Sequence, residues 1–298
     1  MVWMLLVLFY GLAKGGREIC KKKALTKNNV IEVLFFYTLL SFVFVLPQAP
    51  RAGGVEAKQY LLIALKSFVI FVAWICSFNA IKKLPISLMG VLDLSRVLFA
   101  TLMGVLFLGE AMSVSQIWGL ALVSAGLLML PLQGIIRTRR GAKSGTQSIN
   151  AARQGEPVRA VYVALALISC VLNAVSGTMD KYLMSGNLTS GQLQFWYMLF
   201  LTAYYGIYIL IKRIRLDWRK MLRNYWIWIL AVLFVLADRA LFIANGYPDS
   251  KVTVMTLIKQ SGCLVTVLGG RFIFKEKNII YRLVCAAVII AGIVIAVL

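Results

Sequence analysis

The chain has 298 residues, of which 61% are hydrophobic, and its mean hydropathy is +0.84. Soluble domains carry about 45–50% apolar residues, so this composition excludes an ordinary soluble protein and, with it, most soluble enzymes. The net charge is +21, from 32 Lys and Arg against 11 Asp and Glu. In a soluble protein this excess would suit a nucleic-acid binder, but in a membrane protein it is expected in the loops on one side of the bilayer. We therefore expect the lipid bilayer as a partner and no nucleic acid.

The supply of reactive side chains is narrow. The sequence contains no histidine, and its five cysteines lie in or beside apolar stretches without a Cys-x-x-Cys pair. The commonest general base and the commonest transition-metal ligand are therefore missing. We predict no catalytic centre, no metal site and no cofactor, although carboxylate or lysine chemistry is still allowed.

Apolar stretches long enough to cross a bilayer follow one another along the whole chain. The sequence predicts ten membrane-spanning helices at about 2–22, 29–47, 58–82, 85–108, 113–133, 159–184, 190–213, 223–246, 250–275 and 279–297. The first is read as a spanning helix rather than a cleavable signal, because its basic residues follow the apolar run instead of preceding it.

The longest connection divides these helices five and five. Residues 134–158 are rich in Gly, Ser, Gln and Arg, which is typical of a flexible linker. We predict a first five-helix repeat over 1–133, the basic linker over 134–158, and a second five-helix repeat over 159–298. An odd number of crossings per repeat would invert the second copy relative to the first, as in many secondary transporters.

Short matches between the halves support this repeat. A gap-free register runs from Asn79 opposite Asn245 to Glu110 opposite Glu276, so that Phe107-Leu108-Gly109-Glu110 faces Ile273-Phe274-Lys275-Glu276. These two motifs close the fourth and ninth predicted helices, and the chain resembles EamA-type members of the drug/metabolite transporter superfamily there. The resemblance implies a ten-helix carrier of the inner membrane, with a central cavity lined mainly by the first, third, fourth, sixth, eighth and ninth helices. It names no substrate.

The basic residues are distributed unevenly among the predicted connections. The odd-numbered connections hold 21 Lys and Arg, and the even-numbered ones hold four, namely Arg51, Lys58, Lys181 and Lys251. Positive residues in short loops stay in the cytoplasm, so the count places both termini outside the cell. Members of the resembling family usually keep both termini inside. Either way, an even number of helices puts the two termini on one side.

Eleven charged residues fall inside the predicted spans, where an ionised side chain needs a partner or a wet cavity. They are Lys14, Arg17, Lys66, Arg96, Arg239, Lys259 and Arg271, with Glu18, Asp93, Asp180 and Asp238. Asp93 and Lys259 occupy equivalent positions in the repeat register. We expect them to face each other, either as a charge pair at the substrate site or as a permanent salt bridge between helices.

Other side chains extend this candidate site. Arg96 lies one turn from Asp93 and either binds an anionic group or holds Asp93 in place. Asp238 and Arg239 are adjacent and point about 100° apart on a helix, so at least one must seek another helix or water. Lys14 is predicted to line the entrance, and Trp74 either stacks on a planar ligand or packs against neighbouring helices.

Small residues recur in the fifth and tenth helices at a spacing that permits close helix contact. They include Gly119, Gly126 and Gly292, so we expect these two helices to form a scaffold.

The sequence thus predicts a multi-pass protein of the cytoplasmic membrane that carries a small solute by alternating access, as a monomer or homodimer. Basic residues exceed acids within the spans, which favours an anionic or zwitterionic metabolite. An intramembrane enzyme acting on a lipid-linked substrate, an exporter of cationic compounds and a non-transporting membrane subunit are the alternatives.

Overall fold

The computed structural model describes residues 2–99, 114–129 with gaps at 116, 120 and 127–128, 149–186, 188–247, 250, 255, 258–276 and 279–297. Glu110 and its motif, residues 100–108 of the predicted fourth helix and residues 134–148 of the predicted linker lie outside the described residues.

The described part of the chain is helical, with no strand in it. Its elements are α1 (Val2–Ala24), α2 (Val30–Val45), the 3₁₀ helix η1 (Leu46–Arg51), α3 (Ala57–Lys83), α4 (Ile86–Asp93), α7 (Ile149–Met184), α8 (Ser190–Lys212), α9 (Trp218–Leu222), α10 (Tyr225–Asn245), α12 (Ser261–Phe272) and α13 (Ile279–Val297). Five of these segments are long and apolar enough to cross a membrane. The predicted class, an all-α multi-pass membrane protein, is confirmed.

Polar residues between the apolar stretches fix where the helices begin. Asn29 caps α2 by accepting a hydrogen bond from the Ile31 amide, and Asn224 caps α10 in the same way through the Trp226 amide. Thr189 and Gln192 form a reciprocal capping box at the start of α8. Such caps satisfy amides that have no partner within the helix, so they set the boundaries between spans.

Two connections differ from the sequence expectation. The stretch between α8 and α10, expected to be a loop, contains the short helix α9, whose N-cap Asp217 accepts from the Lys220 amide. Helix α7 begins at Ile149, ten residues before the predicted start of the sixth span at 159. Neither segment carries an apolar run long enough to predict a spanning helix.

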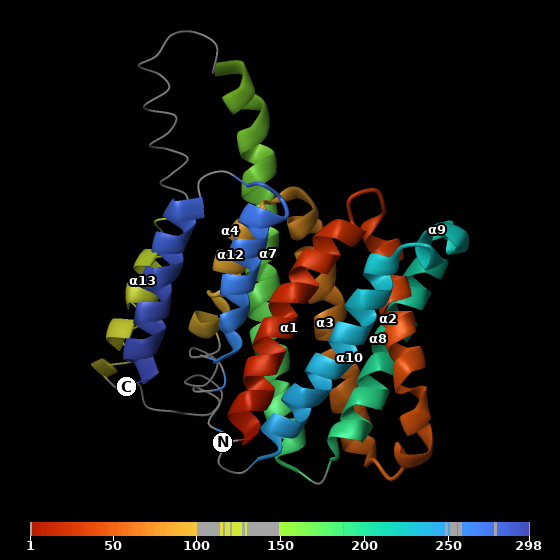
Figure 1. The fold of residues 1–298 in the computed structure, drawn as a ribbon. Helices are drawn as coiled ribbons and strands as arrows, with labels where there is room; N and C mark the ends of the chain where they lie inside the picture. The colour runs from red at the N-terminus through yellow and green to blue at the C-terminus, as the bar shows by residue number, and fades with distance from the viewer. Residues whose placement is uncertain are drawn as a thin grey trace.

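Helix α1 packs against α10 and α12, while α3 packs against α7 and α8 (Figure 1). The contact between α1 and α12 depends on glycine. A Cβ added at Gly262 would lie 2.6 Å from the carbonyl oxygen of Gly11, so the two backbones touch. The fifth and tenth predicted helices also meet closely, since a Cβ at Gly292 would lie 2.8 Å from the Gly119 carbonyl oxygen. The predicted close contact of these two helices is confirmed at these residues.

The odd-numbered connections gather at one end of the bundle. Lys220 donates to the carbonyl of Lys27 at 2.9 Å, which joins the seventh connection to the first. Lys82 donates to the carbonyl of Asn28 at 2.7 Å, which joins the third connection to the first. Figure 1 shows the α1–α2 turn and α9 at the upper end and both termini toward the lower end.

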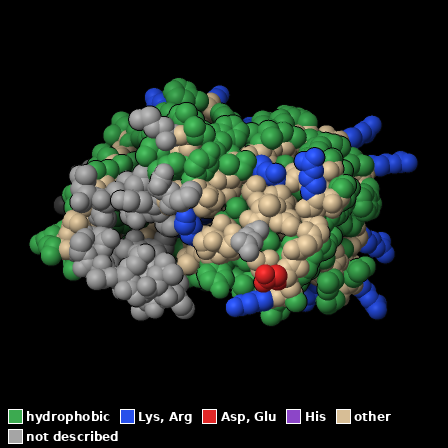
Figure 2. Space-filling view, turned by 90° about the horizontal axis from the view of Figure 1, so that it is seen from below, with side chains coloured by type: hydrophobic (Ala, Val, Ile, Leu, Met, Phe, Trp, Pro, Cys, Tyr) green, Lys and Arg blue, Asp and Glu red, His purple; other side chains and the backbone are tan. Residues whose placement is uncertain are grey.

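The even-numbered connections meet at the opposite end. The Gln192 amide donates to the Gly53 carbonyl at 2.7 Å, and Lys181 donates to the Asn245 carbonyl at 3.1 Å. Seen from this end, apolar side chains make up much of the outline of the molecule, and uncharged side chains and backbone, with a few charged side chains among them, make up much of the centre (Figure 2). The fold therefore has one strongly basic end, one nearly neutral end and an apolar perimeter, which suits a bilayer.

Candidate functional site

Helix α1 carries a row of charged side chains into the helix bundle. Lys14, Arg17 and Lys21 are each only 7% exposed, and Glu18 lies half-buried beside them. Their spacing of three and four residues places them on one face of the helix. Lys21 pairs with Glu18 at 2.6 Å, so Lys21 lies inside the bundle and not in the first basic connection, where the charge count had placed it.

The first cluster joins α1 to the end of α4. Lys14 donates directly to Asp93, and Arg96 binds the other carboxylate oxygen of Asp93 at 2.8 Å. The side chain of Asp93 is 26% exposed, compared with 9% for Lys14. Two cations thus share one carboxylate, which leaves a net positive charge at this position.

The second cluster joins α1 to α10. The guanidinium of Arg17 donates to Asp238 at 2.9 Å, and it lies over the rings of Tyr10 and Phe234 at 5.4 and 5.2 Å. Aromatic faces attract cations, so the rings hold the guanidinium in place on the sides that the carboxylate leaves open.

The third cluster joins α3 to α7. The sequence analysis did not predict that its residues lie together. Lys66 of α3 pairs with Asp180 of α7 at 2.9 Å, and its ammonium lies 3.5 Å from the centre of the Tyr197 ring. The side chain of Lys66 is 2% exposed. The sequence placed both Lys66 and Asp180 within predicted spans. A charge at that depth needs a partner, so a search for oppositely charged residues at similar depth could have predicted this pair.

The expected partnership of Asp93 with Lys259 is wrong for the described structure. Asp93 is held by Lys14 and Arg96, while Lys259 lies 5.8 Å from the Tyr10 ring and forms no ion pair with a described residue. Lys14 instead reaches Asp93 from α1, a helix of the same predicted half. The repeat register shows which residues occupy equivalent positions in the two halves, but equivalent residues need not contact each other.

Trp74 and Arg239 lie in other surroundings. Trp74 is buried in a stack with Tyr37 at 5.3 Å and packs edge-on against Phe234 at 5.0 Å, which is the packing alternative. Arg239 points away from Asp238 and donates to Gln48 at 2.6 Å. The expected divergence of Asp238 and Arg239 is confirmed, and only Asp238 joins the α1 row.

Glu276 closes the basic end of the bundle. It lies in the connection between α12 and α13 and accepts from the amides of Ile86 and Ser87 at 2.6 and 3.2 Å, at the start of α4. Burial raises the pKa of this carboxyl, but the hydrogen bonds from Ser87 and Ile86 and the charge of Lys22, 3.7 Å away, outweigh burial and hold the pKa below its ordinary value.

The charged residues lie on α1, α3, α7 and α10, at the end of α4, and directly before α12. These are the six helices that the resemblance implied as the lining of a transport pathway. Among the described residues, no group of three or more His, Cys, Asp or Glu is placed to hold a metal ion. The arrangement is suited to binding and releasing charged groups.

Comparison with known proteins agrees with this picture. Residues 1–131 match the model of the EamA-like transporter family. A curated protein from Sinorhizobium sp., the "Uncharacterized transporter in cobO 3'region", is 26% identical over 98 residues, which cover 33% of this chain and 70% of that protein. The resemblance to this family is confirmed over residues 1–131.

A solved structure described only as "Crystal structure of protein" shares the fold, with a TM-score of 0.62 at 12% identity over 97% of this chain and 98% of the other. The family match and the curated relative favour a transporter over an enzyme.

Proposed function

We propose that this EamA-like chain is a secondary transporter that moves a small anionic or zwitterionic metabolite across the cytoplasmic membrane. It works by alternating access between two inverted five-helix halves. The sequence contains no P-loop, so the energy comes from a gradient of solute or ion.

The observation that carries the proposal is the excess of cations among the charged side chains inside the bundle. Six are basic, and four are acidic. The basic ones are Lys14, Arg17, Lys21, Lys66, Arg96 and Lys259, and the acidic ones are Glu18, Asp93, Asp180 and Asp238. A desolvated cation without a carboxylate is costly, so the excess favours a solute that brings a negative charge.

Within this set, we assign first contact with the solute to Lys259, Lys14 and Arg96. Lys259 has no carboxylate partner among the described residues, and Lys14 and Arg96 share one. An arriving carboxylate or phosphate would complete their coordination with little rearrangement. Asp93 holds Lys14 and Arg96 in place, and Asp238 holds Arg17. Either carboxyl group could carry a coupling proton once a solute displaces its cation.

Two ion pairs connect the predicted halves. Arg17 to Asp238 and Lys66 to Asp180 each join a helix before the linker to a helix after it. Rocking of one half against the other would lengthen such pairs, and a bound solute that replaces one partner would lower the cost of that step.

The test is a binding screen followed by transport. Thermal stabilisation of the purified protein is measured across a panel of anions, zwitterions and cations, and ligands that stabilise it are then tested for counterflow in liposomes. We expect stabilisation by anions or zwitterions and counterflow of the same compounds. Stabilisation by cations alone would favour the exporter of cationic compounds.

The enzyme alternative uses Asp93, Asp180 or Asp238 as the acid or base on a lipid-linked substrate. All three carboxylates are occupied by lysine or arginine in the structure, which disfavours proton transfer to a substrate. Turnover of a lipid-linked compound without counterflow would establish it.

A further inference from the structure

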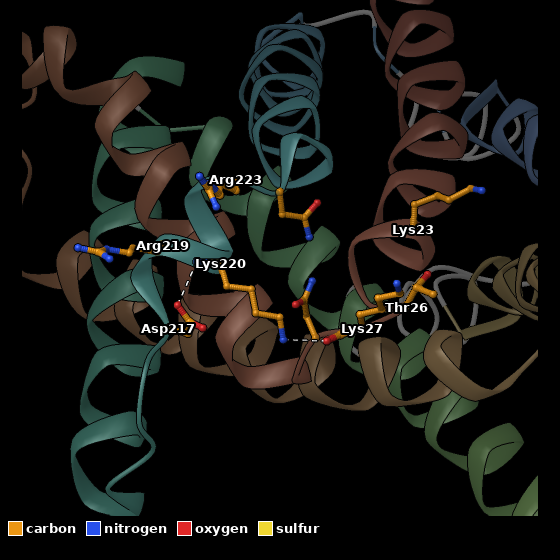
Figure 3. Close-up of a pocket in the computed structure, with 9 residues that line it drawn as sticks. Lys23, Thr26, Lys27, Asp217, Arg219, Lys220 and Arg223 are labelled. Atoms are coloured by element: carbon orange, nitrogen blue, oxygen red, sulfur yellow. Dashed lines mark hydrogen bonds between the residues drawn. The ribbon is translucent and has the colours of Figure 1, made fainter.

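A pocket lies at the basic end of the bundle, between the α1–α2 turn and the α9 region (Figure 3). Its volume is about 660 Å³. The lining residues are Lys23, Thr26, Lys27, Asn28, Asp217, Arg219, Lys220, Arg223 and Asn224. Residues that are almost 200 positions apart in the chain therefore form one concave surface.

The lining is strongly positive. Five of these side chains are basic and one is acidic. The acidic one, Asp217, is engaged by the Lys220 amide at 3.0 Å as the cap of α9. Arg219 and Arg223 are exposed, and neither forms an ion pair with any residue in the described part of the chain.

The two walls are fixed relative to each other. Lys220 reaches from α9 to the Lys27 carbonyl at 2.9 Å, as Figure 3 shows. Asn224 donates to the Ala24 carbonyl at 3.4 Å from the other side of the same connection. The pocket is thus a feature of the fold and not a chance approach of two loops.

Apolar and aromatic side chains alternate with the basic ones along the α9 region. Trp218, Leu222 and Tyr225 are 49%, 47% and 60% exposed. Trp218 is anchored edge-on against Phe36 of α2, with ring centres 4.7 Å apart. Exposed Trp and Tyr beside basic residues are typical of the level of the lipid headgroups, where an aromatic ring has one apolar and one wet side.

We propose that this pocket binds the phosphate of an anionic phospholipid, taken from the leaflet at the basic end of the bundle. Arg219 and Arg223 line the pocket on its α9 side and Lys23 and Lys27 line it on the α1–α2 side. A guanidinium group matches a phosphate in geometry, and the lysines add positive charge. Trp218 and Leu222 offer an apolar surface to the acyl chains. A freely soluble phosphate would gain nothing from those exposed apolar side chains, so the lipid is the better fit.

The experiment compares lipid retention by matched variants. The purified protein is exchanged into detergent with phosphatidylglycerol or with phosphatidylcholine, and bound lipid is counted by native mass spectrometry together with the shift in melting temperature. The test variant is Arg219→Gln with Arg223→Gln. The matched control is Lys212→Gln with Arg215→Gln, which removes two exposed charges from the same connection but outside the pocket.

We expect preferential retention of phosphatidylglycerol and a higher melting temperature with it. Each basic residue near a membrane surface contributes about a fivefold gain in affinity for anionic lipid, so the test variant should bind roughly 30-fold more weakly. The control removes charges outside the pocket, so its loss should be clearly smaller than that of the test variant. Lys27→Gln, which removes a cation from the opposite wall, should give a loss of about fivefold and serves as a second variant.

Equal losses in the test and control variants would overturn the proposal, because they would show a diffuse attraction without a site. Inorganic phosphate and glycerol phosphate form the second arm. If they raise the melting temperature as phosphatidylglycerol does, and the test variant abolishes the effect, the pocket binds a soluble anion and the lipid assignment is wrong. Transport of the solute is measured separately, so failure here leaves the proposed function standing.

Discussion

Lys66 shows that a charged side chain inside this bundle needs compensating partners. Its ammonium is enclosed by the Asp180 carboxylate and the Tyr197 ring, and almost none of its side chain is exposed. Removal of one partner leaves the other charge buried without compensation. We expect Asp180→Asn to lower the stability of the purified protein by about 3–5 kcal/mol.

The double variant Lys66→Met with Asp180→Leu is the control for that prediction. It removes both charges and keeps the volume similar, so it should be much closer to the wild type in melting temperature than Asp180→Asn alone. Equal destabilisation by the single and double variants would show that the pair contributes through packing and not through charge.

Glu276 gives a prediction about pH. Its folded-state pKa is held below the ordinary value, so its contribution to stability is complete above the unfolded pKa of about 4.3 and is lost as pH falls through the lower folded pKa. Glu276→Gln should cost about 1 kcal/mol at pH 7.

Melting curves from pH 7 to pH 3 check this, because the gap between wild type and Glu276→Gln should close only at the acidic end. Asp217→Asn is the matched control, since Asp217 also caps a helix at this end of the bundle. A gap that stays constant down to pH 3 would contradict the assigned role of the carboxylate.

The candidate site was only partly predictable at the residue level. Charges within apolar spans identified Lys14, Asp93, Arg96 and Asp238, because each must be paired or hydrated. Which partner each one takes depends on helix rotation and on side-chain reach. Those quantities are set by packing of the whole bundle, so Asp93 was given the wrong cation.

At the scale of elements, the contact of α1 with α12 rests on glycine. Gly262→Ala would place a methyl group 2.6 Å from the Gly11 carbonyl oxygen, and neither backbone can yield without moving its helix. We expect a loss of about 1–3 kcal/mol in stability and reduced solute binding, since α1 carries Lys14 and Arg17.

Gly177→Ala in α7 is the control for that change, because an added Cβ there meets nothing within 4 Å. Helix propensity alone should make it neutral or stabilising by up to about 1 kcal/mol. A Gly262→Ala protein that melts with the wild type would show that the two helices can separate freely.

Elements that are long and apolar follow directly from sequence, and α3, α8 and α10 begin and end within a few residues of the expected positions. The helix α9 and the early start of α7 could not be predicted in this way. Neither segment has an apolar run of spanning length to read in the sequence. Helix α9 is held by its Asp217 cap and by contacts of Trp218 and Lys220 with neighbouring elements.

At the scale of the whole molecule, the hydrogen bonds of the connections divide the protein into a basic end and a nearly neutral end. That division agrees with the count of 21 basic residues in the odd-numbered connections against four in the even-numbered ones. The division shows which loops share one side of the bilayer, and the charge count then assigns that side to the cytoplasm.

The positive-inside rule makes that last step a prediction. Arg215 lies exposed at the basic end and Arg51 lies exposed at the opposite end, so each can be replaced by cysteine and treated in intact cells with a membrane-impermeant maleimide. Arg51→Cys should react from outside, and Arg215→Cys only after the membrane is opened. The unsubstituted chain, in which four of the five cysteines are buried, supplies the background.

Labelling of Arg215→Cys from outside would instead place both termini in the cytoplasm, as in the resembling family. The excess of positive charge would then stand outside, and the lipid proposed for the basic pocket would have to come from the outer leaflet.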